Sequence, residues 1–160
     1  SYFTQVTCEV KKWISVPDTD KDLAKNKIIV TRTERYLNPA INYFFLKKYE
    51  KDILFCGTDL EYAIFNLRYN LSVGRLLINN FLELAQAIKQ CKFHITNQTQ
   101  AAQISEGHKT PRIVELCSFA PNVDFIGENA FEFYAQEALE YYVDYLWKLS
   151  ETPKTQTNGL

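Results

Sequence analysis

The stretch from Lys92 to Phe119, KFHITNQTQAAQISEGHKTPRIVELCSF, decides the predicted fold. It begins and ends with short apolar runs, KFHIT and RIVELCSF, whose β-branched and aromatic residues are typical of strands. Residues 97–111 between them are polar and irregular, apart from one helical turn suggested by TQAAQIS. The stretch therefore predicts two strands joined by a long loop.

Outward from this stretch, periodicity and capping residues predict the remaining elements. Further strands are predicted over residues 6–16 and 27–33, joined as a hairpin with a long connection, while DILFC at 52–56 fits a short strand or the continuation of a helix. Helices are predicted over residues 38–50, 58–69, 73–90 and 128–149. Asn38 and Pro39 suit a helix start, and Thr58 with Glu61 fits a capping box.

The predicted order is two strands, three helices, two strands and one long helix. Such a mixed order indicates an α+β fold, with a small antiparallel or mixed sheet packed against several helices and a long C-terminal amphipathic helix. A chain of 160 residues suits a single domain. We expect that domain to span residues 1–150, with a disordered tail over residues 151–160.

Composition narrows the classes of function. Aromatic residues make up 14% of the chain, with ten Tyr and eleven Phe, which suits a packed core, an interface or an apolar cavity. The net charge of −1 gives no basic signal for nucleic acid. Residues 1–51 carry ten Lys/Arg and six Asp/Glu, whereas residues 128–160 carry two Lys/Arg and six Asp/Glu. This asymmetry favours a basic partner or head-to-tail pairing of two copies.

The cysteines and the hydropathy pattern bear on localisation. Cys8, Cys56, Cys91 and Cys117 form no close-spaced pair, which argues against a zinc module and favours buried free thiols. No apolar run approaches 18 residues, so we expect no membrane span. The expectation is a soluble, cytoplasmic protein, although the even number of Cys and two glycosylation sequons leave a secreted form open.

Both histidines begin a His-x-Thr triplet, at His94 to Thr96 and at His108 to Thr110. A His near its ordinary pKa can transfer a proton, and a Thr on the same strand face can hold a phosphate oxygen. Paired triplets of this kind resemble those of two-histidine phosphoesterases. The resemblance covers only these six residues and implies His94, Thr96 and His108 as catalytic residues. That family places its triplets on distant strands, whereas here they lie 14 residues apart.

The turn that follows, GHKTPR, adds Lys109 and Arg112 as candidate ligand-binding residues, because cations beside a glycine can hold an anion. No glycine-rich phosphate loop, metal-ligand motif or nucleophile motif occurs, so no metal and no cofactor are predicted. The leading hypothesis is a non-enzymatic binding or regulatory protein that acts through a protein–protein interface, with a homodimer as one form. The alternative is a small phosphoesterase-like or phosphate-ligand-binding protein that uses His94 and His108. The sequence leaves open whether the protein is an enzyme.

Overall fold

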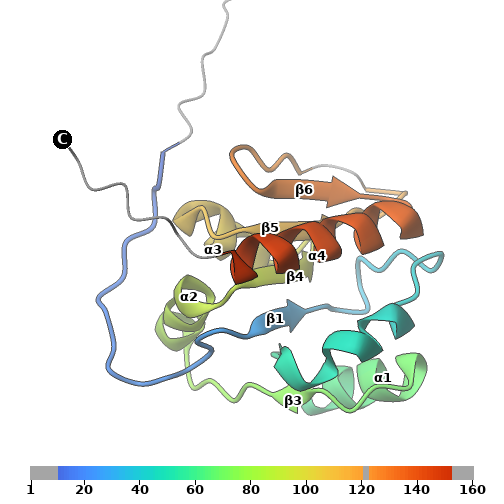
Figure 1. Cartoon of the computed structure of the whole chain (residues 1–160), viewed down its shortest axis with the longest axis horizontal. Coiled ribbons are helices and arrows are strands. Elements are labelled where there is room, and N and C mark those ends of the chain that lie inside the picture. The colour runs from blue at the N-terminus through green and yellow to red at the C-terminus, as the bar shows by residue number, and fades with distance from the viewer. Residues whose placement is uncertain (1–10, 121–122, 153–160) are drawn as a thin grey trace, which may run out of the picture.

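The computed structural model describes residues 11–120 and 123–152, and its centre is a six-stranded sheet (Figure 1). The elements in chain order are β1 (Ile28–Thr31), the 3-10 helix η1 (Phe44–Asp52), β2 (Ile53–Phe55), α1 (Asp59–Tyr69), β3 (Gly74–Arg75), α2 (Phe81–Gln90), β4 (Phe93–Asn97), α3 (Gln100–His108), β5 (Arg112–Glu115), β6 (Ala130–Phe133) and α4 (Gln136–Glu151). The strand order is β3-β2-β1-β4-β5-β6, and every neighbouring pair is parallel. The predicted α+β fold with an antiparallel or mixed sheet is therefore wrong.

Helices cover both faces of the sheet, which makes the fold a doubly wound α/β architecture (Figure 1). The helices η1, α1 and α4 pack on one face, over the buried side chains of Ile28, Ile95 and Ile113. The helices α2 and α3 pack on the other face, over Ile29 and Val114. Because both faces are buried, β1, β4 and β5 are buried along their whole length.

The helix α3 explains why β4 and β5 are parallel. It fills the stretch that the sequence predicts as a long loop. A helix between two strands brings the chain back to the end of the sheet where the first strand began, so the second strand runs parallel to the first. Its buried face carries Ala101, Ala102 and Ser105, so no stripe of large apolar residues marks it in the sequence. Small side chains there favour a close approach of α3 to the sheet.

Two other predicted helices are confirmed in their later residues but are wrong in their first residues, where strands lie instead. Residues 73–90 hold β3 followed by α2, and residues 128–149 hold β6 followed by the first part of α4. Phe131 and Phe133 alternate as in a strand, but Phe131 also fits helical spacing with Tyr134 and Ala138, and no Gly or Pro marks the boundary. The boundary lies at Ala135, whose backbone is extended at the start of α4.

The early chain also differs from its prediction. Residues 11–16 form no strand, and the rest of the predicted strand 6–16 lies outside the described residues, as does the predicted tail after residue 152. The helix predicted from residue 38 is a turn, and a 3-10 helix begins only at Phe44. By contrast, the strands predicted at 27–33, 92–96 and 112–119 are confirmed in part, since β1, β4 and β5 occupy much of these stretches. Of the two alternatives for residues 52–56, the structure has the strand, β2. The capping box of Thr58 and Glu61 is confirmed.

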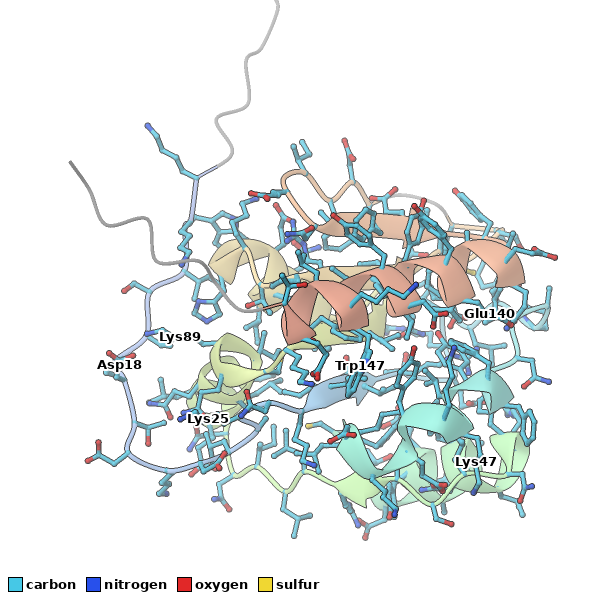
Figure 2. The ribbon with its side chains drawn as sticks, viewed as in Figure 1. Asp18, Lys25, Lys47, Lys89, Glu140 and Trp147 are labelled. Carbon is cyan, nitrogen blue, oxygen red and sulfur yellow. The ribbon has the colours of Figure 1, made fainter. Side chains whose placement is uncertain are left out.

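An extended N-terminal segment, residues 11–26, runs past α2 and α3 before β1. Asp18 pairs with Lys89 of α2 at 2.5 Å, as Figure 2 shows, and the backbone N–H groups of Trp13 and Ile14 donate to the carbonyl of Gly107. A Cβ atom on Gly107 would lie 2.5 Å from Cδ1 of Ile14. The segment can therefore pack this closely only because residue 107 has no side chain.

Within the described part of the chain, no helix is both long and apolar enough to cross a membrane. Cys56, Cys91 and Cys117 are free and buried. Burial raises the pKa of the Cys91 thiol to about 12, so this thiol stays protonated at neutral pH.

Candidate functional site at the carboxyl ends of the strands

The candidate site lies between β1 and β4, where the order in which the chain adds strands to the sheet changes direction. From β1 the chain moves to β2 and β3 on one side, then returns to place β4 on the other side of β1. The connection after β1 leads to η1 on one face, whereas the connection after β4 leads to α3 on the opposite face. In open parallel sheets, the divergence of these two connections leaves a crevice at the carboxyl ends of the strands, where ligands bind.

A buried carboxylate binds several groups at the carboxyl ends of the strands, which we call the carboxyl edge. Glu115, the last residue of β5, accepts two hydrogen bonds from Arg32, at 2.6 Å from Nε and 2.9 Å from Nη2. It also accepts a 2.6 Å bond from the Tyr43 hydroxyl and a bond from the backbone N–H of Asn38. Glu115 thereby holds the connection after β1, residues 32–43, against the end of β5.

The electrostatics of this cluster keep Arg32 charged. Burial, the largest single influence, lowers the pKa of Arg32, but the hydrogen bonds to Glu115 and the electrostatic interactions with Tyr43, Glu115 and Tyr69 together raise it above its ordinary value. Burial, followed by the nearby charge of Glu115, raises the pKa of Tyr43 well above its ordinary value. The guanidinium carbon of Arg32 also lies 4.9 Å from the centre of the Tyr43 ring and 5.6 Å from that of Tyr69. The cluster is a buried ion pair whose carboxylate also accepts hydrogen bonds from Tyr43 and the backbone of Asn38.

The opposite face of the sheet carries a chain of hydroxyl groups. Oγ1 of Thr31 lies 2.8 Å from Nε2 of His94 and donates to Oγ1 of Thr96 at 2.8 Å. Thr96 donates to the carbonyl of Asn97 at 3.0 Å, so Thr31 is left to accept from Nε2–H of His94. Oγ1 of Thr99 lies 3.2 Å beyond Thr96 and extends the chain to the start of α3.

The first turn of α3 differs from that of α1 in how its N–H groups are satisfied. Thr99 is the N-cap of α3, but its side chain makes no capping hydrogen bond. Thr58 caps α1 with both bonds of a capping box, at 3.2 Å from the Glu61 N–H to Thr58 Oγ1 and 2.9 Å from the Thr58 N–H to Glu61 Oε2. The amino end of α3 therefore keeps donors and the positive end of the helix dipole available to an anion.

The loop after β5 lies beside this helix end because Gln98 holds it there. The side chain of Gln98 accepts from the backbone N–H of Cys117 at 2.7 Å and donates to the carbonyl of Ala120 at 2.6 Å. Phe119 lies between these two anchor points and is 73% exposed. An exposed aromatic ring thus stands in the loop next to the start of α3.

The residues predicted as catalytic lie in different surroundings. His94 and Thr96 point from β4 into the buried hydroxyl chain, and burial, followed by the charge of Arg112, lowers the pKa of His94 to about 3. His108 ends α3 at the other edge of the sheet, and burial, followed by the charges of Lys89 and Lys12, lowers its pKa. The His94 ring is therefore neutral near pH 7.

The residues predicted to bind a ligand are engaged in internal contacts. Arg112 is fully buried and donates to Glu106 and, at 3.0 Å each, to the carbonyls of Thr110 and Ile126. Lys109 pairs with Glu106 and donates to the carbonyl of Ile126 at 3.1 Å. These bonds fasten the end of α3 and the segment before β6 to the start of β5.

A pocket of about 860 Å³ lies along the amino ends of the strands, opposite the carboxyl edge. Its lining includes Ser15, Lys92, His108, Lys109 and Leu146, from the N-terminal segment and the carboxyl ends of the helices. His94 does not line it, so the pocket does not unite the two histidines. Unlike this pocket, the carboxyl edge combines the donors at the start of α3 with the topological switch point of the sheet.

Sequence reasoning missed Arg32, Tyr43 and Glu115 as site residues. A signal is present for two of them, since Arg32 and Glu115 directly follow buried apolar runs, IIVT and RIV. No group of three or more His, Cys, Asp or Glu among residues 11–120 and 123–152 is arranged to hold a metal ion. Comparisons with protein-family models, curated proteins and solved structures found no match for the chain.

Proposed function

We propose that the protein binds a phosphate-bearing ligand of the nucleotide class at the carboxyl ends of β1 and β4. The observation that carries the proposal is the amino end of α3, which stands at the topological switch point without a side-chain cap. A phosphate group there accepts from the backbone N–H groups of Gln100 and Ala101. No glycine-rich loop is needed for this contact, because the helix end itself supplies the donors.

The class of ligand follows from what surrounds the helix end. Phe119 offers an exposed ring on which a base can stack, and Gln98 anchors its loop beside Thr99. Arg35 is an exposed cation in the connection after β1, at the same edge of the sheet. An anionic group with an attached planar ring system fits this combination better than inorganic phosphate alone.

The roles predicted for His94, Thr96, His108, Lys109 and Arg112 are not needed for this proposal. Thr96 contributes indirectly, because its hydroxyl lies 3.2 Å from that of Thr99. The expected protein–protein interface remains a separate proposal, and it concerns another surface of the molecule.

A substitution that replaces the ligand's charge tests the proposal. Thr99→Asp places a carboxylate on the first-turn N–H groups of α3, where an N-cap Asp stabilises a helix by roughly 0.5–1 kcal/mol. We expect affinity for nucleoside mono- and diphosphates to fall by at least about tenfold, since the carboxylate competes for the same donors. Thermal unfolding should occur at an equal or higher temperature, and isothermal titration calorimetry measures the affinity.

The matched control is Thr58→Asp, which adds the same charge at the N-cap of α1. It should leave affinity unchanged, and Thr99→Ser should also bind. Wild-type affinity in Thr99→Asp, or equal losses in both Asp variants, would show that the ligand does not bind at α3.

A further inference from the structure

The helix α4 presents two apolar sides, and the described residues bury one of them while they leave the other partly exposed. Leu139, Val143 and Leu146 face the core. A second set of uncharged side chains follows the spacing of one helix side, and we call it the tyrosine stripe: Ala138, Tyr141, Tyr142, Tyr145 and Leu149. Tyr141 is 66% exposed, and Tyr145 and Leu149 are 41% and 44% exposed. Figure 1 shows α4 at the front of the molecule, with no other helix or strand of residues 11–120 and 123–152 in front of it.

The rings of the tyrosine stripe hold one another in place. Phe131 of β6 stacks on Tyr142 with ring centres 4.4 Å apart and meets Tyr145 edge-on at 5.7 Å. Tyr141 packs edge-on against Tyr142 at 5.7 Å. Ordered aromatic rings lose little conformational entropy when a partner covers them, and Tyr is enriched in interfaces.

The charges beside the tyrosine stripe identify its partner. Glu137 and Lys148 are eleven residues apart, close to three helical turns, so they lie on the same flank of the stripe. Both are exposed, and neither forms an ion pair within the described residues. An acidic group at one end and a basic group at the other form a pattern that is complementary to itself when the helix is reversed.

We propose that the tyrosine stripe binds a second copy of this chain, with the two α4 helices antiparallel about a two-fold axis. A two-fold axis that crosses the helices keeps each flank on its own side and reverses the helix direction. Glu137 of one copy then faces Lys148 of the other, twice in the dimer, and Tyr141 lies opposite Tyr145. The antiparallel arrangement also opposes the two helix dipoles favourably.

Charge reversal tests this arrangement, because two variants that each lose the dimer should form a dimer with one another. Glu137→Lys places Lys against Lys, and Lys148→Glu places Glu against Glu, at both symmetric contacts. Each single variant should raise the dimer dissociation constant by about tenfold or more, since two contacts change from attraction to repulsion. An equimolar mixture of the two variants should restore the dimer, because each mixed pair has opposite charges. Sedimentation over a concentration series measures the masses.

Two controls separate this interface from general effects of charge or folding. Asp20→Lys makes the same change of net charge in the exposed N-terminal segment and should leave the dimer intact. Tyr141→Ser weakens the dimer without a change of charge, and circular dichroism checks that each variant folds. A wild-type chain that stays monomeric, single variants that dimerise normally, or a mixture that stays monomeric would each overturn the proposal.

Discussion

At the scale of single residues, Glu115 determines the shape of the carboxyl edge. It binds Arg32, Tyr43 and the backbone of Asn38 at once, all of them buried. A buried ion pair contributes little net stability compared with an apolar pair, but removal of one partner leaves a buried charge uncompensated. The molecule contains a natural comparison, because Arg68 makes a similar two-bond contact with Glu34 at the surface.

The first prediction at this scale compares Glu115→Gln with Glu34→Gln. Glu115→Gln removes the carboxylate opposite the buried Arg32, and we expect the free energy of unfolding to fall by about 3–5 kcal/mol. Glu34→Gln breaks an exposed pair and should cost less than about 1 kcal/mol. Urea denaturation measures both. Equal losses in the two variants would mean that Glu115 is not the buried anchor described above.

The buried His94 gives a prediction for pH. Its folded pKa of about 3 lies below the ordinary value of 6.5, so the unfolded chain takes up a proton at this site first as pH falls. The stability contributed by neutral His94 is complete above pH 6.5 and is lost as pH falls from 6.5 toward 3. Between pH 7 and pH 5 this linkage amounts to about 2 kcal/mol.

The variant His94→Gln keeps an N–H donor for Thr31 but has no titrating ring. Its unfolding free energy should therefore change less than that of the wild type between pH 7 and pH 5. In a proton NMR titration, the ring signals of His94 in the folded wild type should stay constant over this range. A midpoint near pH 6.5 for His94 would contradict the buried environment.

At the scale of elements, α3 has two roles. Its amino end supplies the proposed anion contact, and its carboxyl end receives the N-terminal segment at Gly107. Glycine inside a helix normally weakens it by about 0.5–1 kcal/mol relative to Ala. That cost is explained here by the contact with Ile14, which a side chain at residue 107 would displace.

Gly107→Ala should therefore release the N-terminal segment even though Ala favours the helix. We expect hydrogen exchange at the Trp13 and Ile14 amides, which donate to the Gly107 carbonyl, to accelerate by about tenfold or more. The double variant Gly107→Ala, Ile14→Ala relieves the overlap and should slow exchange at Trp13 again. Unchanged protection in Gly107→Ala would refute the close contact.

At the scale of the whole molecule, the sequence predicts the strands better than it predicts their arrangement. Short runs rich in β-branched residues, such as residues 27–33, predict strands without reference to the rest of the chain. Their parallel direction depends on the connections between them. The small and polar side chains of α3 give no helical pattern in the sequence, and the residues of β6 are predicted as the first part of the helix that contains α4. An antiparallel sheet follows naturally from the sequence once α3 is taken for a loop.

The candidate site was harder to predict because its parts meet only in the folded sheet. Arg32 and Glu115 are 83 residues apart and pair across the end of β4. The donors at the start of α3 are backbone N–H groups, which cannot be recognised from residue types in the sequence. The histidines are prominent in the sequence because they are rare, and their sequence context does not show that the structure buries the His94 ring.

The central claim, that α3 receives a phosphate group at the switch point, is tested most directly by amide chemical shifts. In a ¹⁵N-labelled sample titrated with ADP, the largest changes should occur at residues 99–102 and in the loop 117–120, with a saturable dependence on concentration. The amides of His108 and Lys109, at the opposite edge of the sheet, should change little. Changes centred on His108 and Lys109, with residues 99–102 unaffected, would contradict the account.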